Sequence, residues 1–131
     1  MILTAATCVA MTVYFEARGE HPDGQLAVAE VVLNRVADPR FAGTPCDVMT
    51  EDWGPLEHDC QFSFWCDGLP ETITDQVAWS VAQDIADMAL DGEVLGHGAT
   101  HFHTTSVDPW WAEELTPVGK IGTHLFYIWE K

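Results

Sequence analysis

The chain contains few basic residues. Its 131 residues include five Lys and Arg against 21 Asp and Glu, which gives a formal net charge of −16 at pH 7. Nucleic acids and anionic membrane surfaces bind proteins through cationic side chains, so we expect neither among its partners. The simplest interpretation of the acidic excess is solubility, including in a salty medium that screens the repulsion between carboxylates.

Long apolar runs, internal repeats and low-complexity segments are also missing. No stretch reaches the roughly 18–20 apolar residues that a membrane-spanning helix needs. The apolar N-terminus lacks the basic residues that begin a signal peptide. A chain of 131 residues suits one compact domain. We therefore predict a single domain over residues 1–131 and expect it to be a monomer.

The four cysteines, at positions 8, 46, 60 and 66, include no CxxC pair. This spacing disfavours a zinc site or a thioredoxin-type redox site. An even number of cysteines in a small domain suits two disulfides, for which three pairings can be drawn, and buried free thiols are the alternative. We expect at least one disulfide in the irregular segment, with Cys46, Cys60 and Cys66 as the main candidates and Cys8 as the fourth.

Hydrophobic periodicity predicts a helix-dominated α+β domain. In the third predicted helix, apolar residues three and four apart define one face: Ile73, Val77, Val81, Ile85 and Met88. The expected elements are helices over residues 4–17, 25–37 and 71–91, an irregular segment over 38–70 that is rich in Pro and Gly, and extended pieces over 99–103 and 124–129.

The second predicted helix is apolar nearly all round, which is typical of a central, buried helix. Asp23 is its expected N-cap. Its polar residues Asn34 and Arg35 need hydrogen-bond partners if they are buried. We expect those partners to be nearby backbone groups or Glu20.

Glu16 is the main candidate for chemistry. It lies at the end of the first predicted helix and directly follows Tyr14 and Phe15. Partial burial disfavours the charged form of a carboxyl group, so we expect its pKa to lie above the ordinary value of about 4.3. A carboxyl group that stays protonated near neutral pH can give its proton to the leaving oxygen of a glycosidic bond. Taken alone, a Glu at a helix end is more often a surface residue or a cap.

The residues around Glu16 carry a resemblance. The string YFEARGE at residues 14–20, with matching residues through position 36, closely resembles the opening motif of the spore cortex-lytic (SleB-like) cell wall hydrolases. Blocks similar to the later motifs of that family follow in the same order and cover nearly the whole chain. They comprise Phe41, Thr44, Cys46 and Val48; the QFS block from Cys60 to Gly68; Ala99 to His103 with Val107, Pro109 and Trp111; and Ile121 to Tyr127.

The resemblance implies a lysozyme-like fold with a short β element, and cleavage of the glycan strand of peptidoglycan. In this family the first Glu of the EARGE string is the catalytic acid, which corresponds to Glu16. The chain lacks the separate peptidoglycan-binding domain of some members and carries an acidic insertion over residues 51–59. We accordingly expect residues 1–131 to be a catalytic domain that acts on the bacterial cell wall, in the periplasm or outside the cell, without a cofactor.

Two mechanisms are open. A two-carboxylate glycosidase needs a second carboxylate roughly 5–5.5 Å from the acid for retention, or roughly 6.5–9.5 Å for inversion. Without one, the 6-hydroxyl of N-acetylmuramic acid can attack the anomeric carbon and leave a 1,6-anhydro sugar. The resemblance favours this lytic transglycosylase reaction, which cuts between N-acetylmuramic acid and N-acetylglucosamine. Four acidic residues are candidates for a second carboxylate beside Glu16, although no motif singles out any of them: Glu20, Asp47, Asp52 and Asp67.

Other polar and aromatic residues are candidates for contacts with the sugar. Gln61 and Ser63 can hold N-acetyl groups or a sugar hydroxyl. Tryptophans, including Trp110, offer faces for sugar rings, although packing is the ordinary role of tryptophan. The set that we expect to bind substrate is Tyr14, Glu20, Gln61, Ser63, Trp65, His101, His103 and Trp111.

The histidines raise the question of a metal. His101 and His103 form a His-x-His pattern, which on a strand puts both rings on one face, as in many zinc sites. His97 and His124 are further candidates. No glutamate accompanies them in a recognisable zinc-protease motif, and the family that the chain resembles needs no metal. We therefore predict no metal, and place His101 and His103 along the sugar groove or beside Glu16.

Other functions stay open at this point. A cell-wall-binding module without catalysis would need only aromatic residues and an acidic surface, but the intact string around Glu16 argues against it. Amidase or peptidase action on the stem peptide is a further enzymatic alternative. A catalytic domain without a signal peptide would also suit a phage-encoded lysin that leaves the cell through a holin.

The charge predicts an unusual response of the lytic rate to salt. A protein of net charge −16 and an anionic cell wall repel each other, and salt shortens the range of this repulsion from a Debye length of about 30 Å at 0.01 M to about 10 Å at 0.1 M. We expect the lytic rate on purified cell walls to rise between about 10 and about 300 mM sodium chloride. A rate that falls steadily over this range would show instead that local positive charge governs binding.

Overall fold

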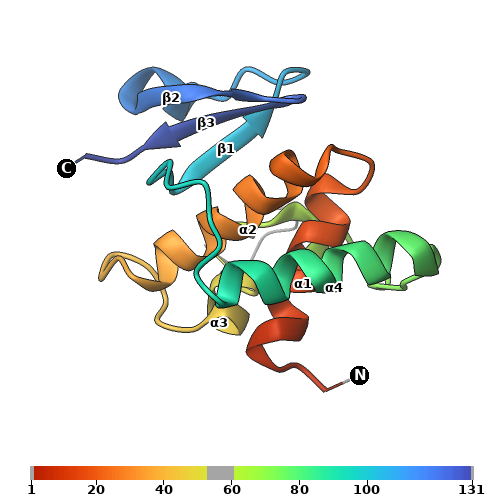
Figure 1. Cartoon of the computed structure of the whole chain (residues 1–131). Coiled ribbons are helices and arrows are strands. Elements are labelled where there is room, and N and C mark those ends of the chain that lie inside the picture. The colour runs from red at the N-terminus through yellow and green to blue at the C-terminus, as the bar shows by residue number, and fades with distance from the viewer. Residues whose placement is uncertain (1, 53–60, 131) are drawn as a thin grey trace.

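The computed structural model describes residues 2–52 and 61–130 and shows a helical body with a small sheet on one side (Figure 1). The α-helices are α1 (Ala5–Ala17), α2 (Pro22–Val36), α3 (Pro45–Met49) and α4 (Gln76–Leu90); the 3-10 helices are η1 (Ser63–Trp65) and η2 (Trp110–Glu114); the strands are β1 (His101–Thr104), β2 (Thr116–Ile121) and β3 (His124–Ile128). The strands pair antiparallel in the order β1-β3-β2. The sheet packs on α2, and α4 packs on α1 and α2. None of these helices is long and apolar enough to cross a membrane.

Helices α1 and α2 form the buried centre of the helical body, as their apolar sequences predict. Helix α1 begins after Thr4, whose hydroxyl accepts a hydrogen bond from the Thr7 amide (3.1 Å). Helix α2 begins at Pro22, about one turn earlier than expected, and its N-cap is His21 rather than Asp23. The His21 Nδ1 accepts a hydrogen bond from the Asp23 amide (3.1 Å). Proline suits the first position of a helix because its missing N–H would have no partner there.

Helix α4 is shorter than expected, and two residues of its predicted buried face are exposed. It begins after Asp75, whose carboxylate accepts a hydrogen bond from the Ala78 amide (3.0 Å), so residues 71–75 lie outside the helix. Val77 and Met88, both expected on the buried face, are 77% and 37% exposed. Ile85 is buried as expected, beside three alanines whose small side chains allow close packing against α1: Ala82, Ala86 and Ala89.

The sheet confirms the two extended segments expected from the sequence and adds a third strand. Strands β1 and β3 pair with His101 opposite Tyr127. Strand β2 has no counterpart in the sequence-based prediction, because Pro117 and Gly119 interrupt its pattern. The structure places an irregularity of the register between these two residues, which is how a sheet accommodates proline and glycine.

Glu20 holds the sheet against the helical body. Its carboxylate accepts hydrogen bonds from the amide and the hydroxyl of Thr123 (2.9 and 3.2 Å), in the turn between β2 and β3. The ring of His124 lies beside the same carboxylate, with Nδ1 3.6 Å from Oε1. Gly122 has a φ of +60°, and a Cβ there would collide with the Glu20 carboxylate, so glycine is required. These contacts fix the turn against the loop that joins α1 to α2.

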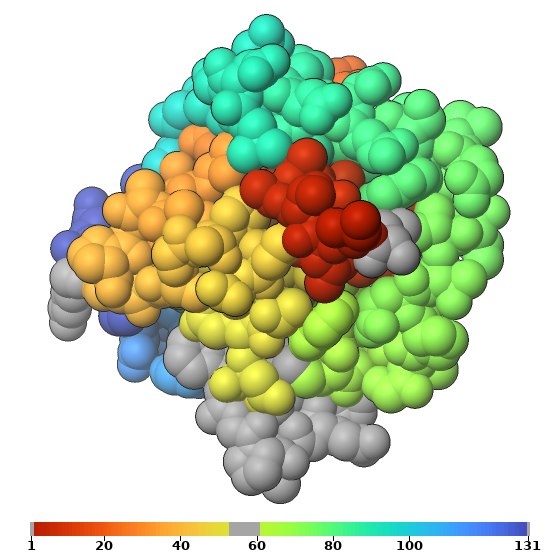
Figure 2. Space-filling view, turned by 90° about the horizontal axis from the view of Figure 1, so that it is seen from below, coloured from red at the N-terminus to blue at the C-terminus, as the bar shows by residue number. Residues whose placement is uncertain are grey.

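A disulfide between Cys8 and Cys46 ties α1 to α3. Figure 2 shows the N-terminal segment lying against the segment that contains α3. Cys66 is also disulfide-bonded, whereas Cys60 lies outside the described residues. No described cysteine is free, so the expectation of at least one disulfide in the segment over 38–70 is confirmed. That segment also contains the short helices α3 and η1.

Removing the Cys8–Cys46 disulfide should destabilise the fold. The two cysteines are 38 residues apart in sequence. The Cys8→Ser/Cys46→Ser double variant should lose about 2–4 kcal/mol of unfolding free energy, because the cross-link limits the entropy of the unfolded chain. Urea denaturation of wild type and variant measures this, with Val77→Ala as a control at an exposed site. Equal unfolding free energies for the double variant and wild type would contradict the prediction.

Candidate active site

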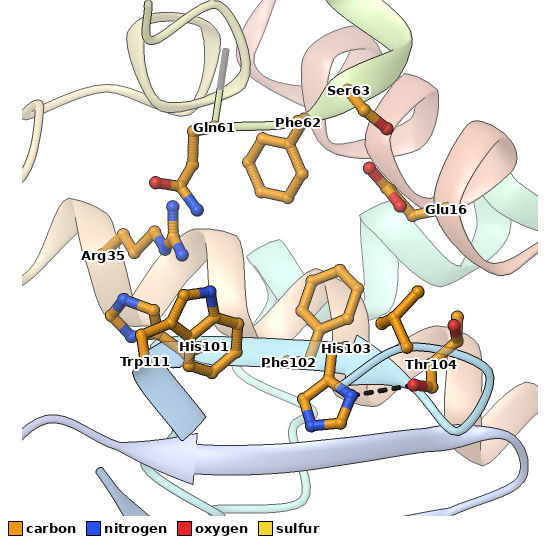
Figure 3. Close-up of a pocket in the computed structure, with 11 residues that line it drawn as sticks. Glu16, Arg35, Gln61, Phe62, Ser63, His101, Phe102, His103, Thr104 and Trp111 are labelled. Carbon is orange, nitrogen blue, oxygen red and sulfur yellow. Dashed lines mark hydrogen bonds between the residues drawn. The ribbon is translucent and has the colours of Figure 1, made fainter. Parts of the chain in front are cut away.

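A pocket lies between strand β1 and the segment that leads into η1, beside the end of α1 (Figure 3). Glu16 reaches it from α1, Gln61 and Ser63 from the η1 segment, and His101 and His103 from β1. The fold therefore brings together residues that are far apart in the sequence. The described lining is Glu16, Arg35, Gln61, Phe62, Ser63, His101, Phe102, His103, Thr104, Val107 and Trp111.

Glu16 points its carboxyl group into the pocket from the last turn of α1. Burial raises the pKa of this group from 4.5 to about 7, and the positive charge of Arg35 opposes the shift. The carboxyl group is thus partly protonated at neutral pH, so it can donate a proton and afterwards accept one. The residue before it, Phe15, stacks on Phe64 with 4.8 Å between ring centroids. This contact packs the end of α1 against the QFS block.

Polar groups lie at the two ends of the pocket, with aromatic rings between them (Figure 3). At one end the Ser63 hydroxyl points toward Glu16. At the other end lies the guanidinium of Arg35. The rings of Phe62 and Phe102 lie between these ends, with 6.3 Å between their centroids. Such a lining suits a ligand that has both apolar faces and polar substituents, as a sugar does.

Arg35 is a buried cation, with 1% of its surface exposed. Its Nε donates a hydrogen bond to the Thr100 carbonyl (2.6 Å). Its neighbour Asn34 donates to the Ala99 carbonyl (2.8 Å). Both bonds confirm the backbone partners expected for these residues, but neither residue bonds Glu20. Burial lowers the pKa of Arg35 to about 10, so the side chain is still charged at neutral pH. Its place in the pocket was not expected. The sequence feature that could have indicated it is the presence of a cation on an otherwise apolar helix.

Two histidines of strand β1 line the pocket. Burial, followed by the charges of two arginines, lowers the pKa of His101 to about 4, so this ring is neutral at neutral pH. The Nδ1 of His103 donates to the Thr104 carbonyl (2.8 Å), and its Nε2 is hydrogen-bonded to the Tyr127 hydroxyl (2.8 Å). The ring of His103 is therefore fixed in one orientation at the pocket wall.

The other histidines discussed as metal ligands lie elsewhere. The Nε2 of His97 donates to the Ala27 carbonyl (3.0 Å), and its Nδ1 accepts from the Ala99 amide (2.8 Å). His124 is buried beside Glu20. Within residues 2–52 and 61–130, no three His, Cys, Asp or Glu side chains form a group that could hold a metal ion.

Several residues expected to bind substrate lie outside the described lining. Tyr14 is 1% exposed, and its hydroxyl accepts hydrogen bonds from two backbone amides just before α4 (3.3 and 3.1 Å). Tyr14 therefore links α1 to the segment just before α4. Trp65 packs against the helical core, Glu20 holds the β2–β3 turn, and Trp110 is 78% exposed. Of the three tryptophans considered as sugar platforms, Trp111 is the one that lines the pocket.

Glu16 is the only carboxylate in the described lining. The acidic residues considered as partners do not contribute to it, and Glu20 faces Thr123 instead. The described part of the pocket therefore offers one acid/base and no second carboxylate. The partners considered were Glu20, Asp47, Asp52 and Asp67.

Burial of Glu16 should lower stability at neutral and alkaline pH. Its pKa in the folded protein, about 7, exceeds the ordinary 4.5. Its contribution to stability is therefore present at low pH and is lost as pH rises through that interval. Because one pKa unit corresponds to about 1.4 kcal/mol, Glu16→Gln should be about 3 kcal/mol more stable than wild type near pH 8. Urea denaturation near pH 8 and near pH 4 tests this, and a difference that does not change with pH would contradict it.

Comparison with known proteins identifies the family that the sequence resembles. Residues 19–127 match the family described as cell wall hydrolase, and the match begins just after Glu16. The spore cortex-lytic enzymes of Halalkalibacterium halodurans and Bacillus subtilis are 34% and 31% identical to the chain over 90% of its length. The chain spans about a third of the length of these relatives, 33% and 35% respectively.

Two solved structures are similar over almost the whole chain. The catalytic domain of the germination-specific lytic transglycosylase SleB from Bacillus anthracis has a TM-score of 0.75 and 27% identity, covering 97% of this chain and 96% of that one. The catalytic domain of SleB from Bacillus cereus has a TM-score of 0.69 and 27% identity, covering 94% and 88%. These matches confirm the helix-dominated, lysozyme-like α+β fold. The chain belongs to the cell wall hydrolase family.

Proposed function

We propose that this chain is a lytic transglycosylase domain that cleaves peptidoglycan between N-acetylmuramic acid and N-acetylglucosamine, with Glu16 as general acid and base. The observation that carries the proposal is the single carboxylate of the described pocket, with a pKa of about 7. The similarity to a structure described as a lytic transglycosylase supports it. The substrate places the domain's action at the cell wall, in the periplasm or outside the cell.

The reaction needs two proton transfers, one from Glu16 and a second back to it. Protonated Glu16 gives its proton to the glycosidic oxygen, the bond from that oxygen to the anomeric carbon breaks, and positive charge develops on the muramic acid ring. The 6-hydroxyl of the same ring then bonds to the anomeric carbon and loses its proton to the Glu16 carboxylate. The product is a 1,6-anhydro sugar, and no water is consumed. Because the nucleophile belongs to the substrate, the enzyme needs no second carboxylate.

A pKa of about 7 suits both steps. The group must be protonated before the first step and ionised after it, so a pKa near the working pH serves both. The charge of Arg35 favours the carboxylate that forms in the first step. Burial favours the protonated carboxyl group that is restored in the second step.

Other residues of the lining are proposed to position the sugar. Ser63 is exposed and faces Glu16, so its hydroxyl can hold a sugar hydroxyl beside the acid. Gln61, His101 and His103 supply hydrogen-bonding groups, and Trp111 supplies an aromatic face.

The products and the loss of activity in a Glu16 variant test the proposal. Glu16→Gln keeps the shape of the side chain but cannot donate the proton, so lysis of purified cell walls should fall by about 100-fold or more. Mass spectrometry of wild-type digests should show 1,6-anhydromuramic ends. Glu93→Gln, which changes an exposed glutamate, should keep wild-type activity.

Each competing function predicts a different result. Reducing muramic ends would identify a hydrolase, and released stem peptides an amidase or peptidase. Binding to cell walls without lysis would identify a binding module. A Glu16→Gln variant with near wild-type lysis would exclude Glu16 as the acid.

A further inference from the structure

We propose that Arg35 anchors a subsite of the pocket that binds a carbonyl or carboxylate oxygen of the glycan substrate. The proposal rests on the proposed function and adds a recognition element to it. The oxygen belongs either to an acetamido group or to the lactyl group of N-acetylmuramic acid. Both groups offer the guanidinium the same chemistry, namely a carbonyl-type acceptor oxygen with a methyl group close to it.

The guanidinium of Arg35 is fixed but incompletely hydrogen-bonded. It lies over the rings of Phe41 and Phe62, 4.8 and 5.5 Å from their centroids, and its Nε is bonded to the Thr100 carbonyl. Its Nη1 is buried and has no hydrogen-bond partner in the structure. A buried donor without a partner is costly and uncommon in native proteins. The fold therefore holds a charged donor ready for an acceptor from outside the chain.

No carboxylate of the described chain compensates this charge by direct contact. The described ion pairs do not include Arg35. Glu51 and Glu16 act on it only electrostatically, and the Glu51 Oε1 is itself buried without a hydrogen-bond partner. A buried cation that stabilised the fold would be expected to have a paired acceptor. Its absence in the described residues favours a role in binding.

The pocket around Arg35 fits the two candidate groups. Arg35 lies at the opposite end of the pocket from Glu16, and the rings of Phe62 and Phe102 lie between them (Figure 3). A methyl group of the substrate can pack on these rings while the adjacent oxygen meets the guanidinium. Arg35 is also the only Arg or Lys in the described lining, in a chain of net charge −16. An oxygen held here would place the sugar ring relative to the Glu16 carboxyl.

Kinetics with modified substrates test the subsite. Wild type and Arg35→Lys are compared on intact glycan strands, on de-N-acetylated strands, and on strands whose stem peptides were removed to leave free lactyl carboxylates. Arg35→Lys keeps the charge but loses the fixed planar donor, so KM on intact strands should rise about 10-fold or more, with a smaller effect on kcat. Arg40→Lys is the matched control, because Arg40 also lies over an aromatic ring, Trp129, and bonds a backbone carbonyl.

The comparison of the three substrates identifies the group that supplies the oxygen. If the KM ratio between Arg35→Lys and wild type collapses on de-N-acetylated strands, Arg35 binds an acetamido oxygen. If the ratio grows on strands with free carboxylates, Arg35 binds the lactyl group. A ratio that is the same on all three substrates would overturn the proposal. Absence of 1,6-anhydro products from wild type would instead count against the proposed function alone.

A binding measurement that keeps Arg35 intact covers the case in which Arg35→Lys does not fold. The chain has three arginines, at positions 18, 35 and 40, so their guanidinium nitrogens can be resolved by NMR. Adding a peptide-free tetrasaccharide of N-acetylglucosamine and N-acetylmuramic acid to Glu16→Gln should shift the Arg35 Nη signals and leave those of Arg40 unchanged. Binding of the tetrasaccharide without a shift at Arg35 would overturn the subsite.

Discussion

The carboxyl group of Glu16 is held at the boundary between the helical core and the pocket, where burial raises its pKa to about 7. The position depends on α1 as a whole. The helix is buried along most of its length, so its last turn is held in place and keeps Glu16 partly buried at the pocket. The disulfide from Cys8 to Cys46 fixes α1 from its other half. The raised pKa of Glu16 is therefore a consequence of the burial of the helix that carries it.

The second wall of the pocket depends on the contact between Glu20 and the β2–β3 turn. Strand β1, which carries His101 and His103, is joined to the helices through β3 and that turn. Arg35 adds a further tie, because its Nε bonds the Thr100 carbonyl just before β1. The YFEARGE string thus has two roles. Glu16 faces the pocket, and Glu20 contacts the sheet that forms the second wall of the pocket. Two carboxylates four residues apart on one string therefore take different roles because their surroundings differ.

The sequence predicted the elements whose patterns are local and missed those that depend on tertiary contacts. The buried helices α1 and α2, the extended segments near β1 and β3, and the raised pKa of Glu16 follow from apolar runs and neighbouring aromatics. On α4, Ile85 is buried as expected, but Val77 and Met88 were wrongly placed on the buried face, because periodicity alone cannot show where the edges of that face lie. Tyr14 and Glu20 stand beside Glu16 in the sequence, yet each points to a different part of the fold. Arg35 was expected as a structural residue, and only the folded chain shows it in the pocket.

The proposed catalysis requires a Glu16 carboxyl group that titrates near neutral pH. The most direct test is NMR titration of the side-chain carboxyl carbon of Glu16 in the folded wild-type domain, with the exposed Glu93 as an internal reference. The structure predicts a pKa of about 7 for Glu16. A Glu16 pKa near the ordinary value of 4.5 would contradict the claim that burial makes this group the acid, because the group would then be ionised at neutral pH.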